Sequence, residues 1–518
     1  MASNLFENYE TFKDQTANLL YDYFYPHKLE WPASCCRWEI FFGCRTDGKY
    51  HEKVNAWQGL GSLVVMGYLD IPQPGFKLEK ERKRMTLGKK YDPNQRIEIQ
   101  KIFVHPGEIN CLKCWPKNKR IIATHSDTKN VYLWDINSQK SAHDRINIEA
   151  NQPDLILSGH TDVAAYALDW SSTEPIVASG GRDRQILLWN VEHYFNSMGK
   201  ITEEEKDQTN QDYMSDNEDS SNAQNSKQML PDQANNYSSN LENKDSRNRE
   251  EGMNGKSYKN QSSVSRIQKS LQSYLTDSKP QRKSISSLEP YARLKGHLGN
   301  IEDLVFKPDS SCELVSVGID RYILFWDTRA GSVSGKGNIK PVQKALMVHH
   351  DDINTVDWSK SDTNYIATGS NDKKVAIIDI RKLPSDSSEQ TERCPAICKV
   401  LEGHTSSINV VRFSPFSPHY IASSSEFLII WDLREQAKND PVFFKHAGHV
   451  GQIVDFEWNS SQPWSFISAS DDIDQPLPGC SLQFFRPIDL LLMDELEAEQ
   501  YLEKYSNLPD NDVEMIAV

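Results

Sequence analysis

The amino-acid sequence predicts an all-β protein: a seven-bladed β-propeller with an N-terminal α-helix and a long disordered insertion between blades. Two observations predict this fold. One unit recurs six times: a His near a turn, an alternating strand, a strand of small residues, an Asp in a tight turn and a final apolar strand. The spacing is regular, since 29 residues separate His105 from Trp134, His160 from Trp189 and His297 from Trp326, and 27 separate His404 from Trp431.

Four copies of the unit follow this plan closely, and two are looser. The close copies begin GHTDVAAYALDW, GHLGNIEDLVF, HHDDINTVDW and GHTSSINVVRF, and the looser ones begin HPGEINCLKCW and GHVGQIVDFEW. A Gly-His start and a Trp-Asp end, repeated at a period of about 40–45 residues, is the pattern of WD-repeat propellers, whose blades are four-stranded antiparallel sheets.

The recurring polar residues have a structural explanation. The His, a Ser or Thr of the small-residue strand, the turn Asp and the Trp can hydrogen-bond as one buried network, which fixes their spacing. We therefore expect these residues to hold the blades together and to have no catalytic role. The set is His160, Asp183, Trp189, His297, Asp320, Trp326, Asp372, His404 and Trp431.

The remaining segments complete a five-part organisation. Residues 1–30 are expected to form a helix packed on the propeller, because Phe12, Leu19, Leu20, Tyr23 and Phe24 recur at helical spacing before Pro26. Residues 31–195 are assigned to blades one to three, with the strand-like 31–71 as the first blade and 97–104 closing the ring as an outer strand. Residues 196–289 are a polar, disordered insertion between two blades, 290–487 are blades four to seven, and 488–518 are an acidic C-terminal helix and tail. That helix either packs on the propeller or binds a partner.

Composition and motifs exclude several classes of function. The formal net charge of −15 disfavours direct binding to nucleic acid and favours a basic partner. No run of 18 apolar residues or secretory signal is present, so no membrane span is expected. Cys111 and Cys114 form one CxxC without a second pair at zinc spacing, so we expect no metal. No catalytic constellation is found, and the Gly-rich GSVSGKGNIK lacks the spacing of a phosphate-binding loop. The sequence therefore predicts a binding scaffold that uses no cofactor and is not an enzyme.

Four segments outside the repeat pattern carry a more specific resemblance. They are LLYDYFYPHKLEWP at 19–32, HPGEIN at 105–110, PDLILSGHTD at 153–162 and FFKHAGHVGQIVDFEWNSSQPW at 443–464. With these segments the sequence resembles the retinoblastoma-associated, MSI-type histone-binding WD-repeat proteins, and in particular their plant branch, over nearly all of the chain except 196–289. The resemblance implies a nuclear, non-catalytic subunit that binds histones H3 and H4. It also implies a role in transcription regulation through chromatin-assembly, Polycomb-type methyltransferase or histone deacetylase complexes.

The resemblance implies a first recognition surface on the top face of the ring, where acidic and aromatic side chains take a basic peptide such as the histone H3 tail. Some positions depart from the family pattern: Ala164 and Ser407 replace acids, Asn409 replaces an aromatic residue and Cys111 replaces an Arg. For Glu108 and Glu302 the alternative is that they are solvated loop acids. The matching positions are Glu30, Trp31, Pro32, Glu108, Asn110, Tyr166, Glu302, Asp320, Asp352, Asn354 and Asp471.

A second implied surface is a side groove for the first helix of histone H4. The loop REQAKNDPVFF contributes only two acids, Glu435 and Asp440, where the family usually has several. The alternative is that the aromatic residues simply pin the N-terminal helix to the propeller. The implied groove residues are Leu20, Tyr23, Phe24, Asp440, Phe443 and Phe444.

A different class of function remains open at this point. WDTR at 326–329 and WDLR at 431–434 are similar to a motif by which some WD-repeat proteins dock on the adaptor of a cullin-type ubiquitin ligase. The alternative function is therefore that of a substrate receptor, although an Arg at this position can also cap the end of a strand.

Overall fold

The computed structural model describes residues 21–28, 33–38, 41–44, 62–69, 97–141, 151–194, 286–330, 339–384, 393–471 and 481–487. All of the described strands belong to one unit of the chain, Met1–His193 with Ile285–Val518. The first part of the predicted N-terminal helix (4–20), most of the insertion and the predicted C-terminal helix lie outside the described residues.

The described strands form seven sheets. The first sheet contains, from the centre outward, β2 (Ala33–Arg37), β3 (Phe41–Cys44), β4 (Leu63–Leu69) and β5 (Ile97–Val104). The second contains β6 (Ile109–Trp115), β7 (Asn118–Ser126), β8 (Val131–Asp135), β9 (Leu155–Leu157) and β13 (Ser286–Leu288). The third contains β10 (Ala164–Trp170), β11 (Ile176–Gly181), β12 (Gln185–Asn190) and β14 (Ala292–Lys295).

The fourth sheet contains β15 (Ile301–Phe306), β16 (Glu313–Gly318), β17 (Ile323–Asp327) and β18 (Gln343–Ala345), and the fifth contains β19 (Ile353–Trp358), β20 (Tyr365–Ser370), β21 (Lys374–Asp379) and β22 (Ile397–Glu402). The sixth contains β23 (Val410–Phe413), β24 (Tyr420–Ser424), β25 (Leu428–Asp432) and β26 (Val442–His446). The last contains β27 (Gln452–Trp458), β28 (Phe466–Asp471), β29 (Ser481–Pro487) and β1 (Tyr21–Lys28). Three short 3-10 helices follow third strands: η4 (Thr328–Ala330), η5 (Ile380–Lys382) and η6 (Glu435–Ala437).

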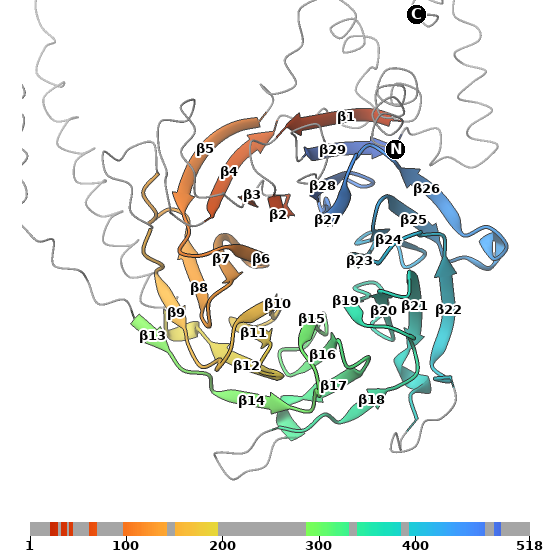
Figure 1. Ribbon diagram of the computed structural model, residues 1–518, viewed down its shortest axis with the longest axis horizontal. Helices are drawn as coiled ribbons and strands as arrows, with labels where there is room; N and C mark the ends of the chain where they lie inside the picture. The colour runs from red at the N-terminus through yellow and green to blue at the C-terminus, as the bar shows by residue number, and fades with distance from the viewer. Residues whose placement is uncertain are drawn as a thin grey trace, which may run out of the picture. The chain divides into compact units, whose positions relative to one another are not determined.

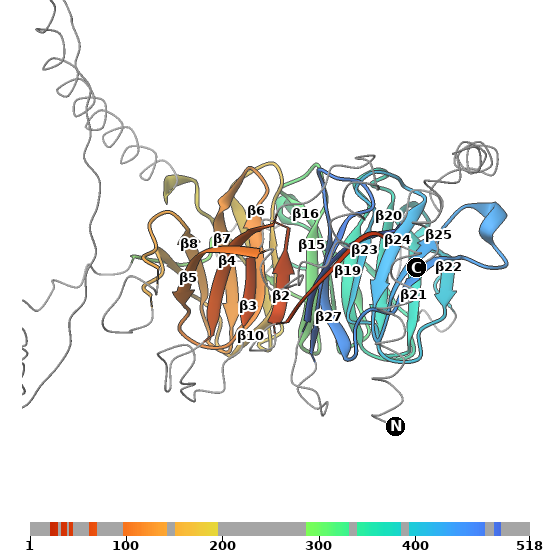
Figure 2. The same ribbon diagram turned by 90° about the horizontal axis from the view of Figure 1, so that it is seen from above.

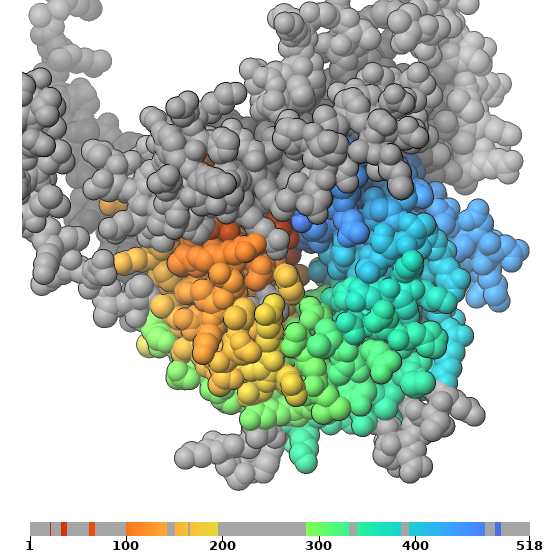
Figure 3. All heavy atoms as spheres, in the orientation of Figure 1, coloured from red at the N-terminus to blue at the C-terminus, as the bar shows by residue number. Residues whose placement is uncertain are grey.

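The sheets stand around a common centre (Figures 1 and 2). The innermost strands β2, β6, β10, β15, β19, β23 and β27 contact one another in this order, and β27 contacts β2 again. Pairing within each sheet is antiparallel except for β13 with β9. In the space-filling view the colours of the chain follow one another around the same centre (Figure 3).

The hydrophobic core lies between neighbouring sheets. One cluster joins Leu188 of β12 to Leu304 and Leu314 of the next sheet, and another joins Val315 and Phe325 of that sheet to residues of β19 and β20. The small-residue strands allow this close packing, since every residue of β11 is buried. The side chains of Trp134, Trp189, Trp326 and Trp431 are among the largest that are fully buried.

The predicted fold class is wrong in the number of WD-repeat blades, because the described residues contain six blades of this type. In six sheets a buried His binds a Ser or Thr of the second strand: His105–Thr124, His160–Ser179, His297–Ser316, His349–Thr368, His404–Ser423 and His449–Ser468. In the described part of the sheet β2–β5 there is no such pair. The ring therefore combines six WD-type blades with one sheet of a different kind.

The predicted N-terminal helix is wrong at its end, where residues 21–28 form strand β1. This strand pairs antiparallel with β29, with Tyr25 opposite Phe484. The prediction of 97–104 as an outer strand is confirmed, since β5 lies next to β4 at the edge of the first sheet. Its predicted role in closing the ring is wrong, because β1 supplies the outer strand of the last sheet. Pairing between residues over 400 positions apart leaves no local pattern, whereas apolar residues at helical spacing are visible in any short window.

The position of the insertion differs from the prediction too. It lies within a blade, because β12 before it pairs with β14 after it. The end of the predicted disordered stretch is ordered: β13 adds a fifth, parallel strand to the preceding blade through β9. A polar composition predicts the lack of a packed core but does not reveal the boundary between two strands of one sheet.

Candidate binding site at the channel mouth

Bulges in the innermost strands aim side chains into the centre of the ring. In β2, β6, β15, β19 and β27 the pairing with the second strand skips one residue near the start of the strand. A bulge redirects the side chain of the skipped residue. The five skipped residues all line a central channel with a volume of about 350 Å³, and they are Ser34, Asn110, Glu302, Asn354 and Val454. Tyr166 and Asn409 line the channel too. Asp352 does not line it, but its charge acts on Glu302. We call these eight residues the channel mouth.

Hydrogen bonds from the mouth residues join each blade to the next. Asn354 Nδ2 donates to the carbonyl oxygen of Ile408 at 2.9 Å, and Asn409 Nδ2 donates to that of Ile453, also at 2.9 Å. Asn354 Nδ2 also donates to Asn371 Oδ1 at 2.7 Å. Both N–H groups of the Asn354 amide and one of the Asn409 amide are therefore donated, and the amide oxygens can accept, which suits a ligand that donates hydrogen bonds.

Two carboxylates of the mouth, those of Glu302 and Asp352, form no ion pair with any of the described residues. Burial raises the pKa of Glu302, the charge of Asp352 raises it further, and Arg182 offsets only part of this effect. Burial and the charge of Asp351 raise the pKa of Asp352, and Arg321 offsets only part of this effect. A raised carboxyl pKa means that the ionised form is disfavoured here, so a bound cation would relieve this cost.

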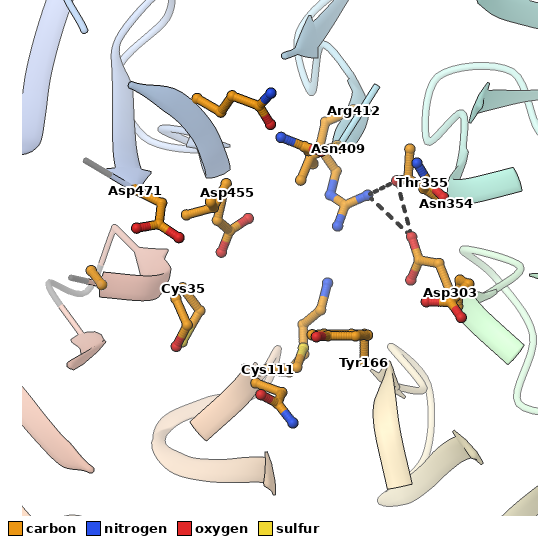
Figure 4. A pocket seen from close by; sticks show the side chains of 18 of the residues that line it. Cys35, Cys111, Tyr166, Asp303, Asn354, Thr355, Asn409, Arg412, Asp455 and Asp471 are labelled. Atoms are coloured by element: carbon orange, nitrogen blue, oxygen red, sulfur yellow. Dashed lines mark hydrogen bonds and ion pairs between the residues drawn. The ribbon is translucent and has the colours of Figure 1, made fainter. Parts of the chain in front are cut away.

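The wall below the mouth carries two pairs of opposite charges, and Lys113 lines the channel as well. Arg37 Nη1 lies 2.5 Å from Asp455 Oδ2, and Arg412 Nη1 lies 3.7 Å from Asp303 Oδ2. Asp303 also accepts from Thr355 Oγ1 at 3.1 Å, as the dashed lines in Figure 4 show. Ligand cations therefore meet unneutralised carboxylates at the mouth, and paired charges deeper in the channel.

Comparison with known proteins agrees with this architecture. The family model described as WD domain, G-beta repeat matches residues 151–190, 288–327, 340–379 and 396–432. Four stretches of the propeller therefore match the WD repeat. It is 29% identical to the WD-40 repeat-containing protein MSI4 of Arabidopsis thaliana over 94% of this chain and 83% of that protein. It is 28% identical to histone acetyltransferase type B subunit 2 of Debaryomyces hansenii over 38% of this chain and 48% of that protein. The predicted resemblance to MSI-type WD-repeat proteins is confirmed.

The propeller brings together part of the predicted top-face set. Asn110, Tyr166, Glu302, Asn354 and Asp471 line the channel. Tyr166 is 45% exposed, so its ring is accessible at the mouth. Figure 4 shows Tyr166, Asn354, Asn409 and Asp471 around the common opening.

Other members of the predicted set lie elsewhere. Asp320 binds His297 Nδ1 at 2.9 Å and the Leu298 N–H at 2.7 Å, so its carboxylate serves the blade network. Glu108 is exposed and does not line the channel, and its backbone N–H donates to Asp127. Glu30, Trp31 and Pro32 lie outside the described residues.

The predicted side groove is not assembled as a helix-walled site by the described residues. The backbone of Tyr23 and Phe24 belongs to strand β1, and Leu20 lies outside the described residues. Phe444 is buried, with its ring centroid 5.5 Å from that of Tyr21. Phe443 packs on Tyr420 and Trp464 with centroids 5.3 and 5.4 Å apart. These contacts favour the alternative that the aromatic residues pin the N-terminal segment, while Asp440 is exposed.

The Arg residues of the WDTR and WDLR motifs bind the Asp of their own motif. Arg329 Nη2 lies 2.8 Å from Asp327 Oδ2, and Arg434 Nη2 lies 2.5 Å from Asp432 Oδ2. Arg381 makes the same contact with Asp379 at 2.8 Å, although its strand lacks the Trp. A role in ending the third strand explains all three residues, so the motif gives no separate support to adaptor docking.

Sequence reasoning missed the charged residues of the channel wall. It also missed a set of acids that join neighbouring blades and do not line the channel. These acids left a signal in the sequence, because each precedes the aromatic end of an innermost strand, in LDW, VDW and FEW, at Asp169, Asp357 and Glu457. Asp169 and Asp357 are half-buried and accept backbone N–H groups of the next blade. Among the described residues no cluster could hold a metal ion, and no helix is long and apolar enough to cross a membrane.

Proposed function

We propose that this propeller is a non-catalytic scaffold subunit of nuclear chromatin-assembly or chromatin-modifying complexes, and that its channel mouth binds a basic peptide of the histone H3 tail type. The observation that carries the proposal is the pair of unneutralised carboxylates, Glu302 and Asp352, beside the accessible ring of Tyr166. The similarity to histone acetyltransferase type B subunit 2 of Debaryomyces hansenii supports a role in a chromatin complex.

The chemistry of the mouth fits a Lys or Arg side chain. The guanidinium or ammonium group donates charge-assisted hydrogen bonds to carboxylate and amide oxygens, and it is attracted to the face of an aromatic ring. Asn354 contributes an amide oxygen, since its N–H groups are already donated. No covalent step is involved, which agrees with the role of a scaffold.

Peptide binding to charge-neutral variants tests the proposal. We expect the full-length protein to bind a histone H3 N-terminal peptide, and Glu302→Gln with Asp352→Asn to weaken binding at least about tenfold, because each lost charge-assisted bond is worth roughly 1.5–3 kcal/mol. Fluorescence anisotropy with labelled peptide measures this. The matched control is Glu435→Gln, an exposed acid of η6 that does not line the channel. Equal affinity of the double variant and the parent protein would contradict the proposal.

The pH dependence gives a second readout of the same experiment. Because burial and Asp352 raise the pKa of Glu302, this carboxyl group takes up a proton at a higher pH than an ordinary one. A bound cation favours the ionised form, so binding should release protons. Affinity should therefore fall as the pH is lowered from about 7 to about 5, and the Glu302→Gln variant should lose most of this dependence.

A further inference from the structure

One WD-type blade carries apolar residues where its neighbours carry polar ones. In three blades the residue after the network His donates its backbone N–H to the turn Asp, which makes Thr161, Leu298 and His350 equivalent. The residues before the same Asp in the turn are Arg182, Ile319 and Asn371. Only the blade β15–β18 has an apolar side chain at both positions.

Leu298 and Ile319 form one exposed apolar patch. Leu298 is 64% exposed and Ile319 is 39% exposed. Their loops are bonded to each other, since the Ile319 N–H donates to the carbonyl oxygen of Asn300 at 3.1 Å. The loops are also packed together, because a Cβ built at Gly299 would lie 2.6 Å from Ile319 Cγ1. The fold does not require apolar side chains here, as the polar residues of the two neighbouring blades show.

The patch is continuous with the channel mouth. The loop that carries Leu298 leads directly into β15, whose bulge residue is Glu302. On the other side, Arg321 Nη1 lies 3.5 Å from the carbonyl oxygen of His350, in the loop of the next blade that holds Asp352. Leu298 and Ile319 therefore stand beside both carboxylates that are short of positive charge.

We propose that Leu298 and Ile319 form an apolar subsite that takes an aliphatic side chain of a bound basic peptide, a few residues away from the Lys or Arg held at the mouth. This inference rests on the proposed function and adds a specificity to it: the ligand is a segment that combines a cationic and an aliphatic residue. The carboxylates provide the charge complementarity, and the patch provides surface that is removed from water when the aliphatic side chain binds.

The test compares matched peptides on the full-length protein. Peptides that carry one Arg and one Leu, separated by one to five residues, are compared with the same peptides in which Ser replaces Leu. We expect one separation to bind about tenfold more tightly than its Ser counterpart. Leu298→Ser with Ile319→Ser should remove this advantage and leave the affinity for the Ser peptides unchanged. The control is Val442→Ser, at an apolar residue of β26 that is 37% exposed.

The outcomes separate this inference from the proposed function. If Arg-containing peptides bind through Glu302 but the Leu peptides gain nothing, the subsite is wrong and the proposed function stands. If no basic peptide binds, both fail. If the double Ser variant changes the oligomeric state in light scattering and not the peptide affinity, the patch covers a second copy of this chain and the inference is overturned. Thermal unfolding of the double variant at the parent temperature verifies that it is folded.

Discussion

At the scale of single residues, hydrogen-bond directions can be followed through the blade networks. The Asp320 carboxylate accepts, so His297 carries a proton on Nδ1 and donates to it at 2.9 Å. Ser316 Oγ accepts from Trp326 Nε1 at 2.8 Å and lies 2.7 Å from His297 Nε2. In the blade β10–β12 with β14, Trp189 donates elsewhere, and His125 of the preceding blade lies 2.8 Å from Ser179 instead.

In the blade β23–β26 the network lacks the hydrogen bond between the His Nδ1 and an acid of the turn. His404 Nε2 lies 2.7 Å from Ser423 Oγ, as the equivalent atoms do in the other blades, but its Nδ1 is buried and has no partner among the described residues. The acid of the turn is Glu426, whose carboxylate accepts from Thr405, Ser406 and Ser425. Burial lowers the pKa of His404 to about 4, so its imidazole is neutral at physiological pH.

This difference predicts unequal costs for two similar substitutions. His297→Ala removes a bond to Ser316 and leaves Asp320 without its His partner, whereas His404→Ala removes a bond to Ser423 and also a buried ring nitrogen that has no partner among the described residues. Both leave a cavity of the same size. We expect His297→Ala to lower the free energy of unfolding more than His404→Ala, by roughly 1–3 kcal/mol, in denaturant titrations at neutral pH. Equal losses would show that the Asp contributes nothing to blade stability.

At the scale of elements, acidic residues of the innermost strands bind neighbouring blades together at four of the seven junctions among the described residues. Asp169 accepts from the Phe306 N–H at 2.9 Å, Asp303 from Val356 at 3.0 Å, and Asp357 from Phe413 at 2.7 Å. Asp455 and Glu457 accept from Cys36 and Trp38 of the first sheet. These bonds complement the hydrophobic clusters between sheets, because they satisfy backbone N–H groups that the ladders leave open.

Asp357 allows the charge and the hydrogen bond to be separated. Burial raises its pKa, and Arg412 and the Phe413 N–H partly offset this, so the ionised form gains little from its surroundings. Asp357→Asn keeps an acceptor oxygen and should change stability little, whereas Asp357→Ala leaves a buried N–H unpaired and should cost about 1–3 kcal/mol. Chemical denaturation measures both, and amide hydrogen exchange at Phe413 reports on the bond. If Asn is as costly as Ala, the charge and not the acceptor matters.

At the scale of the whole molecule, the repeated blades could be predicted from the sequence, whereas the strand that closes the ring could not. The six His-containing units and the channel-lining Asn110, Glu302 and Asn354 follow from local spacing and from resemblance. The strand β1, the place of the insertion within a blade and the paired charges Arg37–Asp455 do not, because they depend on pairing between residues that are up to 466 positions apart. Apolar periodicity near residue 20 predicted a helix, and tertiary pairing with β29 overrides it at residues 21–28.

Because β1 closes the ring, we expect one residue near the N-terminus, Tyr21, to determine the stability of the last blade. Tyr21 is 4% exposed, its hydroxyl donates to His446 Nδ1 at 2.7 Å, and its ring packs edge-on against Phe444 and Phe485. His446 accepts on Nδ1 because its Nε2 donates to Gln483 at 2.9 Å. Tyr21→Phe should therefore cost only about 1 kcal/mol, whereas Tyr21→Ala should cost about 3–5 kcal/mol.

The decisive measurement is where the Tyr21→Ala variant loses protection from amide hydrogen exchange. If β1 closes the ring, exchange should accelerate in β26, β28 and β29 as well as in β1, because losing the outer strand exposes the edge of β29 and loosens the sheet that it joins. Association of the variant at high concentration should increase for the same reason. Faster exchange confined to residues 21–28 would mean that the last blade is stable without β1 and that this strand does not stabilise it.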